Sequence, residues 1–265
     1  MHSRAQIVAT LGPSSNKKDV FKEMVKNGLD VVRFNFAWGN IAERSREVLM
    51  VREMAKELHR HIPIIADLPG PRVKENDGHS YDKTLLVHLT DHDKKCIQFC
   101  VDEQIEYIAL SFVGSAKDII EARDFIHSIG GKQKIIAKVE RQMALDHIDE
   151  IIDASDAIMV ARGDLGSEVP LEEIPFVEEM LIKKCNEKEK PVIVATQMMM
   201  SMVSNDEPTR ADVTDVAFAI LQLADAVMLS EETTVGHHPA LTVSVMEKVI
   251  NASEKRVESK IVHTL

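Results

Sequence analysis

The stretch IIAKVE at residues 135–140 is followed by MVARGDLG at 159–166, and both place charged side chains at the ends of apolar, strand-like runs. Side chains of a strand alternate between its two faces, so Lys138 and Glu140 are expected to point the same way. Asp164 follows a second apolar run and reaches the same site if the two strands are neighbours about 5 Å apart. We therefore expect these three charges to share one site.

The rest of the chain repeats this pattern, because short β-branched runs alternate with longer amphipathic ones, as in successive βαβ units. The strand-like runs lie at 5–12, 30–37, 62–68, 107–112, 134–140, 157–164, 191–197 and 225–232. Eight strands with their helices predict an α/β protein, a single closed (β/α)8 TIM barrel, and a doubly wound open sheet is the alternative. No linker divides residues 1–265, so we expect one domain, with a loop at 69–82 after the third strand.

Composition limits the classes of partner. The net charge of −11 argues against non-specific binding to nucleic acid or to an anionic membrane, so an anionic substrate needs a local positive site. The sequence contains no run of 18 apolar residues, so we expect no membrane span. The first residues lack a signal-peptide pattern, so we expect a cytoplasmic protein. The three cysteines are too few and scattered for a disulfide framework, and we expect them to be packed in the interior.

Polar residues gather where the predicted strands end, which is where barrels of this kind build their active sites. They are Arg33, Asn35, Asp67, Ser111, Lys138, Glu140, Asp164, Thr196 and Gln197. Two carboxylates, Glu140 and Asp164, are suitable ligands for Mg²⁺ or Mn²⁺, which bind hard oxygen atoms. The alternative is a barrel salt bridge between Lys138 and these acids.

The segment ARGDLG at 161–166 offers a second kind of contact. Gly163 and Gly166 permit close approach of a ligand to the backbone, and a helix that begins here would direct N–H groups at a carboxylate. Lys138 is suited to neutralise an oxyanion or to transfer a proton near an enolate. Neither GxGxxG nor GxxxxGK[ST] is present, so a nucleotide would not be bound by a Rossmann or P-loop motif.

Nearly the whole chain resembles the pyruvate kinase family. The resemblance lies in IVATLGPSS, DVVRFNFAWG, IIADLPGPRVK, IALSF, IIAKVE, IMVARGDLGSEVP, VIVATQMMMSM, PTRADVTDVAFAIL and MLSEETTVGHHP. It implies a (β/α)8 catalytic domain in which Glu140 and Asp164 are similar to the divalent-metal ligands. Lys138 resembles the lysine that stabilises the enolate and the transferring phosphoryl group.

The resemblance implies further roles. Thr196 is similar to the threonine near the substrate methylene, and Arg33 to the arginine that contacts the phosphate. The substrate-carboxylate turn would be Ala161, Arg162, Gly163 and Asp164. The positions that hold a monovalent cation or order the site would be Asn35, Asp67 and Ser111.

The sequence also departs from the family pattern. In place of the lid domain that the family inserts after its third strand, this chain has the loop at 69–82, and a C-terminal regulatory domain is not expected. Ala37 and Trp38 replace a serine-histidine pair, and Leu68 and Pro69 replace a threonine-lysine pair. Two cation-site positions are thus altered, which argues against K⁺ dependence. Trp38 would either cover the substrate or pack against a barrel helix.

Three functions are compatible with these residues. The first is a Mg²⁺-dependent phosphotransferase that converts phosphoenolpyruvate and ADP to pyruvate and ATP through a metal-bound enolpyruvate. The second is a metal-dependent lyase, aldolase or decarboxylase of a 2-oxo acid, and the third is a non-catalytic barrel that binds a metabolite or a partner protein. Homo-oligomers through the outer helices are compatible with all three.

Overall fold

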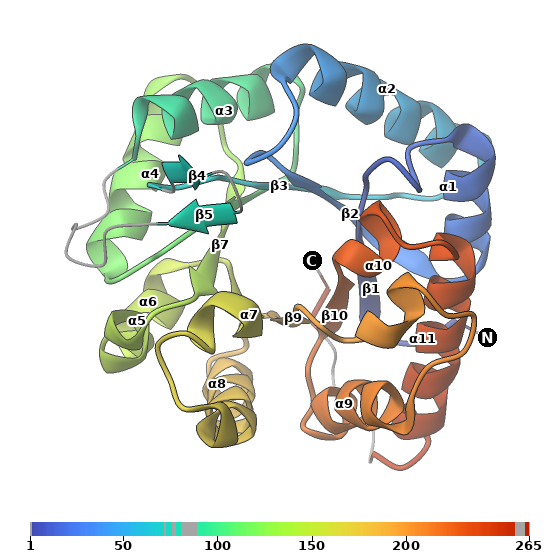
Figure 1. Ribbon diagram of the computed structural model, residues 1–265. Coiled ribbons are helices and arrows are strands. Elements are labelled where there is room, and N and C mark those ends of the chain that lie inside the picture. Colours follow the sequence, from blue (N-terminus) through green and yellow to red (C-terminus); the bar gives the residue numbers. More distant parts are fainter. Residues whose placement is uncertain (1, 72, 76–77, 81–88, 258–262, 265) are drawn as a thin grey trace.

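Eight parallel strands close into a barrel in the computed structural model, which describes residues 2–71, 73–75, 78–80, 89–257 and 263–264 (Figure 1). The order around the barrel is β1-β10-β9-β8-β7-β6-β3-β2. The strands are β1 Gln6–Thr10, β2 Leu29–Asn35, β3 Ile64–Asp67, β6 Tyr107–Leu110, β7 Lys134–Val139, β8 Ala157–Ala161, β9 Val192–Ala195 and β10 Ala226–Leu229. The closed barrel confirms the predicted (β/α)8 fold and excludes the open sheet.

Helices surround the barrel, as Figure 1 shows. They are α1 Lys18–Lys26, α2 Ile41–Glu57, α3 Asp91–Asp102, α4 Ala116–Ser128, α5 Gln142–Asp146, α6 Ile148–Ala154, α7 Arg162–Leu165, α8 Ile174–Glu187, α9 Arg210–Leu221, α10 Glu231–Thr234 and α11 Pro239–Glu254, with 3₁₀ turns at Leu171–Glu173 and Met200–Val203. Capping boxes fix the starts of α2, α3 and α9, where Asn40, Thr90 and Thr209 bind the backbone N–H three residues on. None of the described helices is long and apolar enough to cross a membrane.

The alternation of side chains along each strand produces two apolar cores. Residues that point inward, such as Val8, Ile65 and Met159, fill the barrel interior, and all are buried. Their neighbours that point outward, such as Ile7, Ile64 and Val160, pack against the helices in a larger core. Both faces of every barrel strand are therefore covered, which explains the continuous apolar runs in the sequence.

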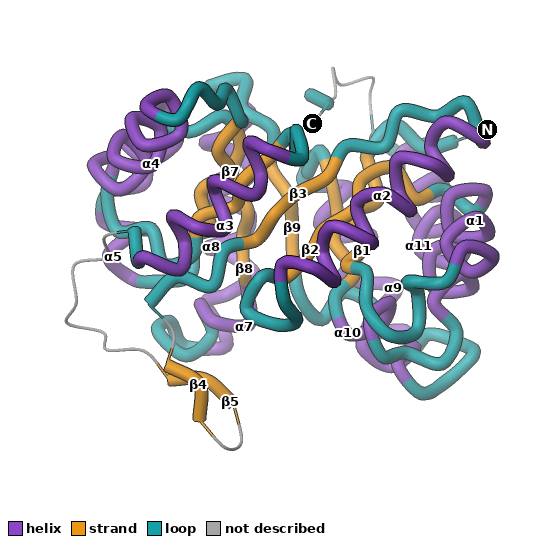
Figure 2. The backbone as a smooth tube through the Cα atoms, turned by 90° about the horizontal axis from the view of Figure 1, so that it is seen from above, coloured by secondary structure: helices purple, strands orange, loops and turns teal. Residues whose placement is uncertain are grey.

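The segment after β3 is not simply a loop, as the sequence indicated for 69–82. Two short antiparallel strands, β4 Val73–Glu75 and β5 Gly78–Ser80, form a hairpin there, while residues 72, 76–77 and 81–82 lie outside the described part. The prediction failed because three-residue strands are too short to show a period. Figure 2 shows the hairpin projecting at the end of the barrel where α7 and α10 also lie. This end carries the carboxyl termini of the barrel strands.

Candidate active site

Lys138 occupies the centre of the polar cluster at this end of the barrel. Its ammonium nitrogen Nζ lies 2.9 Å from Asp67 Oδ1, 2.8 Å from Ser111 Oγ and 2.8 Å from Glu140 Oε1. The prediction that Lys138 and Glu140 point the same way is therefore confirmed. The salt bridge considered as an alternative is also present, and it includes Asp67, which the sequence alone did not pair with Lys138.

Arg33 extends the cluster on the other side of Asp67. Its Nε donates to Asp67 Oδ2 at 2.8 Å, and its terminal nitrogen donates to the hydroxyl of Thr10 at 2.9 Å. Arg33, Asp67, Lys138 and Glu140 expose only 8%, 2%, 4% and 0% of their surface, so their charges are poorly screened by water. Burial alone would raise the pKa of Asp67, but Arg33 and Lys138 outweigh it and lower that pKa to about 2.

The second oxygen of Glu140 is held by the backbone. The N–H of Phe112 donates to Glu140 Oε2 at 2.7 Å. Phe112 has a φ of 58°, a left-handed conformation that a bulky residue rarely adopts. This local turn directs the N–H at the carboxylate, and such strain is typical of functional sites.

The turns after β8 and β9 contact each other. The N–H of Gly163 donates to Thr196 Oγ1 at 2.8 Å, so two predicted substrate contacts are neighbours. Thr196 and Gln197 have φ values of 72° and 57°, which places two consecutive non-glycine residues in the left-handed region. Asp164 is half-buried and lies in α7, which confirms that a short helix begins at this turn.

The side chain of Arg162 leaves this turn and runs between α8 and α9. It binds both oxygens of Asp215 at 2.6 Å, Glu178 Oε2 at 3.1 Å and the carbonyl of Thr196 at 2.6 Å. Only the backbone of Arg162 thus belongs to the predicted substrate turn, beside Ala161 and Gly163. The guanidinium group instead connects the two turns to the outer helices.

Asn35 and Trp38 behave differently from the other predicted site residues. The side-chain oxygen of Asn35 accepts a hydrogen bond from the N–H of Ala37 at 3.0 Å, which stabilises the turn after β2. Trp38 is 51% exposed, so about half of this residue remains accessible to solvent. Both oxygens of Asp67 already bind Arg33 and Lys138, so the structure uses this predicted cation-site residue in ion pairs.

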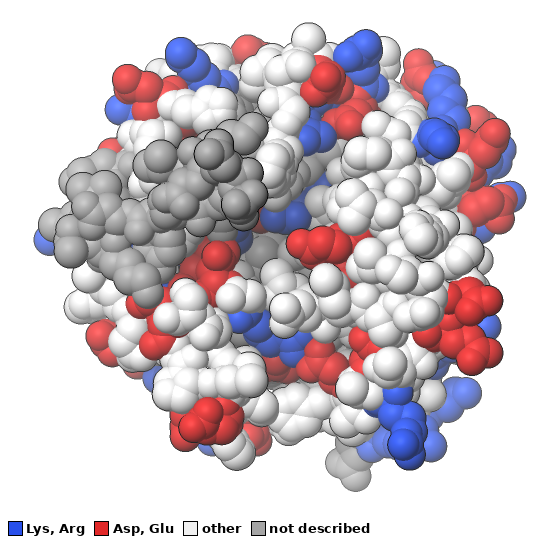
Figure 3. Space-filling view, viewed as in Figure 1, with Lys and Arg blue, Asp and Glu red and all other residues white. Residues whose placement is uncertain are grey.

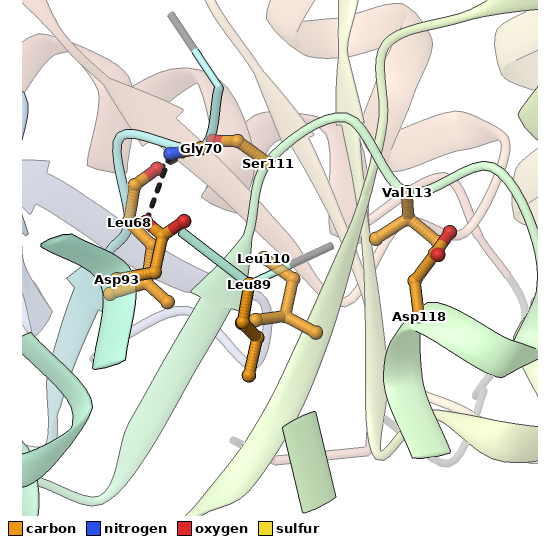
Figure 4. A pocket seen from close by; sticks show the side chains of 8 residues that line it. All are labelled: Leu68, Gly70, Leu89, Asp93, Leu110, Ser111, Val113 and Asp118. Carbon is orange, nitrogen blue, oxygen red and sulfur yellow. Dashed lines mark hydrogen bonds between the residues drawn. The ribbon is translucent and has the colours of Figure 1, made fainter. Parts of the chain in front are cut away.

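A small, mostly apolar pocket lies beside Ser111 and is lined on one side by Leu68 and Gly70, just after β3 (Figure 4). Its volume is about 20 Å³, room for roughly one water molecule. The N–H of Gly70 donates to Asp93 at 3.1 Å on one side of it. Gly70 has a φ of +64°, and a Cβ here would lie 3.1 Å from Phe112 and Ser111, so the turn favours glycine.

In the space-filling view, basic side chains lie in a hollow at the centre of this face, with acidic side chains beside it (Figure 3). The family described as "Pyruvate kinase, barrel domain" matches residues 2–86 and 78–243. The chain belongs to the pyruvate kinase family.

Individual pyruvate kinases support the assignment. The enzyme of Thermococcus litoralis is 34% identical over 336 aligned residues, which cover 97% of this chain and 71% of the relative. Those of Sporosarcina psychrophila and Agrobacterium vitis are 32% and 34% identical, with 96% and 95% of this chain covered and 58% and 70% of the relatives. The alignments are longer than the chain of 265 residues, so these pyruvate kinases contain residues that it lacks.

The family match indicates where the additional residues of the relatives are inserted. Its two segments, 2–86 and 78–243, overlap at 78–86, which includes β5 and the residues after it. The loop at 69–82, which the sequence predicts to replace the lid of other pyruvate kinases, partly coincides with this region. The replacement stays a prediction.

Sequence reasoning missed four residues that contact the predicted site residues. Thr10 accepts from Arg33, and its position at the end of β1 could have been noticed by the same rule that selected the others. Glu178 and Asp215 lie on outer helices, and Phe112 acts through its backbone. Nothing in the spacing of these three indicates a connection to the strand ends.

Proposed function

We propose that this chain is a pyruvate kinase-like phosphotransferase that transfers the phosphoryl group of phosphoenolpyruvate to ADP by way of enolpyruvate. The observation that carries the proposal is the buried ammonium group of Lys138, held between Ser111 and two carboxylates and accompanied by Arg33. Phosphoryl transfer depends on positioned positive charge more than on covalent chemistry of the protein.

Lys138 and Arg33 are assigned to the phosphoryl group and the enolate oxygen. Asp67 binds the side chains of both Arg33 and Lys138 and fixes their positions before a substrate arrives. Little reorganisation is therefore needed when negative charge develops on the substrate. The four buried charges of Arg33, Lys138, Asp67 and Glu140 sum to zero. A bound cation would add positive charge for an anionic substrate at this site.

Glu140 and Asp164 would hold that cation, Mg²⁺ or Mn²⁺. Mg²⁺ is commonly bound through one or two carboxylates, with water and substrate oxygens as the remaining ligands, and these two residues fit that pattern. Among the described residues no group of three or more His, Cys, Asp or Glu side chains is placed to hold a metal ion, so water and substrate oxygens would have to supply the other ligands. The ion would supply charge neutralisation for the 2-oxo acid and the phosphoryl group.

Gly163 and Thr196 are assigned to the other end of the substrate. A Cβ at Gly163 would meet only Thr196, at an ordinary 3.5 Å, so packing within the protein does not require this glycine. Close approach of the substrate carboxylate to the backbone is a reason for it. The hydroxyl of Thr196, next to the Gly163 N–H, would then lie near the substrate methylene and could donate the proton that enolpyruvate receives.

The test separates the three candidate functions. Phosphoenolpyruvate, ADP and Mg²⁺ are supplied and pyruvate is followed by coupled assay, and in parallel the methyl signal of pyruvate is followed by ¹H NMR in D₂O. ADP-dependent pyruvate formation that Lys138→Ala and Asp164→Ala abolish, and that Lys134→Ala on the same strand preserves, supports the kinase.

Other outcomes have distinct meanings. Metal-dependent deuterium exchange without phosphoryl transfer would favour the 2-oxo acid lyase. The absence of both reactions in the unmodified protein would refute the enzymatic proposal and favour the non-catalytic barrel.

A further inference from the structure

The guanidinium group of Arg162 connects both substrate turns to the outer layer of helices. It donates to the carbonyl of Thr196 at 2.6 Å, and its own backbone begins the turn that contains Gly163. On its far side it binds Asp215, from α9, with two contacts of 2.6 Å, and Glu178, from α8, with one of 3.1 Å. The relative position of the two turns therefore depends on what holds Arg162.

We propose that Glu178 is a positioning residue whose carboxylate, together with Asp215, holds Arg162 against Thr196 and thereby fixes the turns at 161–164 and 195–197. The proposal rests on the function proposed above, because these turns matter for that reaction through their predicted contacts with substrate. Glu178 itself acts only through Arg162. Its negative charge determines how firmly the guanidinium group is held.

The two carboxylates that bind Arg162 have different surroundings. The side chain of Asp215 is 31% exposed, whereas that of Glu178 is 2% exposed, and Glu178 Oε1 has no hydrogen-bond partner among the described residues. The two carboxylates beside the single guanidinium group leave one net negative charge. The charge of Glu178 costs more free energy than that of Asp215, because Glu178 is buried and one of its oxygens lacks a hydrogen bond. Burial is the largest effect on the pKa of Glu178, the charge of Asp215 adds to it, Arg162 opposes both, and the pKa rises to about 7.

Glu178 is nevertheless accessible to protons. It lines an open cavity of about 660 Å³ between α8 and α9, together with Arg162, Asp215 and a further cation, Arg210. Within the described part of the chain, these are the charged groups that line the cavity with Glu178. The carboxyl group can therefore exchange a proton near neutral pH, and its charged form holds Arg162 more strongly than its neutral form.

The turn at Thr196 needs such support. Thr196 and Gln197 have left-handed φ values of 72° and 57°, and a conformation of this kind persists only where surrounding contacts enforce it. The bond from Arg162 to the Thr196 carbonyl is one of these contacts. A weaker hold on Arg162 is thus expected to displace the hydroxyl of Thr196 and the N–H of Gly163, which it binds at 2.8 Å.

The test follows the backbone signals of Gly163 and Thr196 and the Nε–H signal of Arg162 by ¹H–¹⁵N NMR of the complete chain between pH 5.5 and 8.5. In the unmodified protein all three are expected to shift with one common midpoint near neutrality. Glu178→Gln should abolish that transition, and Glu179→Gln, an exposed neighbour on the same helix, should preserve it. Glu178→Asp serves if the glutamine variant does not fold, and it should move the midpoint.

Signals that do not titrate, or that titrate unchanged in the Glu178 variants, would overturn the inference. Turnover is measured separately, as kcat/KM for phosphoenolpyruvate with ADP and Mg²⁺. The ratio of unmodified protein to Glu178→Gln should rise from about 1 at pH 6 to about 10 at pH 8, because small displacements of reacting groups have large effects on rate. If the signals titrate together while neither the unmodified protein nor its variants turn over phosphoenolpyruvate, the positioning role stands and the proposed function fails.

Discussion

The ammonium group of Lys138 lies 2.9 Å from Asp67 Oδ1, although 71 residues and one intervening strand separate them. Lys138 belongs to β7 and Asp67 to β3, and β6 lies between these strands in the barrel. Ser111, just after β6, contacts both side chains, at 2.8 Å from Lys138 and 3.4 Å from Asp67. Inward-pointing residues of alternate strands meet in barrels of this type, and here they form a buried ion pair.

Replacement of Lys138 tests the energetic role of this pair. Lys138→Met leaves Asp67 and Glu140 buried without the cation between them, and removal of one partner from a buried ion pair typically costs about 3–5 kcal/mol. We expect the free energy of unfolding, measured by urea denaturation, to fall by that amount. Lys134→Met, at an exposed position of the same strand, should change it by less than about 0.5 kcal/mol. A small effect of Lys138→Met would show that the pair is not coupled to folding.

Arg33→Lys tests whether geometry matters beyond charge. Lysine keeps the positive charge but cannot donate to Asp67 and Thr10 at once from a rigid planar group. We expect kcat/KM for phosphoenolpyruvate to fall by about 10- to 100-fold. Arg60→Lys, at a partly exposed pair with Asp30, is the matched control and should leave the rate unchanged. Equal rates for Arg33→Lys and the unmodified protein would remove Arg33 from the phosphate site.

Asp164→Asn tests the metal assignment. The amide keeps the size of the side chain but loses the charge that a hard cation requires. We expect the Mg²⁺ concentration for half-maximal activity to rise by about 10-fold or more, whereas Asp146→Asn, an exposed residue of α5, should not change it. An unchanged Mg²⁺ requirement in Asp164→Asn would exclude this residue as a ligand.

The pKa of Glu178 predicts how stability varies with pH. Its folded-state pKa of about 7 lies above the ordinary 4.5, so between these values the folded protein binds more protons than the unfolded chain. The contribution of Glu178 to the free energy of unfolding is fully present below pH 4.5 and is lost as the pH rises through 7. The free energy of unfolding is expected to fall by about 3 kcal/mol over this range. We expect Glu178→Gln to flatten the decline of unfolding free energy, measured at intervals from pH 5 to 8. An equally steep decline in the variant would contradict the assignment.

Much of the candidate site could be predicted because its residues follow a local rule. Lys138 and Glu140 share a face since strand side chains alternate, and both lie in or directly after β7. Arg33 and Asp67 stand at the ends of buried strands, where polar groups are conspicuous among apolar residues. These features need only the chain itself to be seen.

Partner choice within the site could not be predicted. The sequence did not indicate that Asp67 binds Arg33 and Lys138, to which the structure directs its two oxygens. Which side chains meet across the barrel depends on strand stagger and on side-chain rotamers, neither of which leaves a periodic signal. The contacts of Glu178 and Asp215 with Arg162 could not be predicted for a further reason, because polar residues on outer helices are usually solvated.

The sequence by itself determined the barrel and the ring of polar residues at its strand ends, because alternation, β-branching and helix caps are local properties of the chain. Only the tertiary structure decided that Lys138 lies between Asp67 and Glu140, and that Arg162 joins the two turns to α8 and α9. Apart from the pair of Lys138 and Glu140, these contacts join residues that lie 16 to 71 positions apart in the chain. Chain closure brings them together, and the low dielectric of the interior gives them their strength.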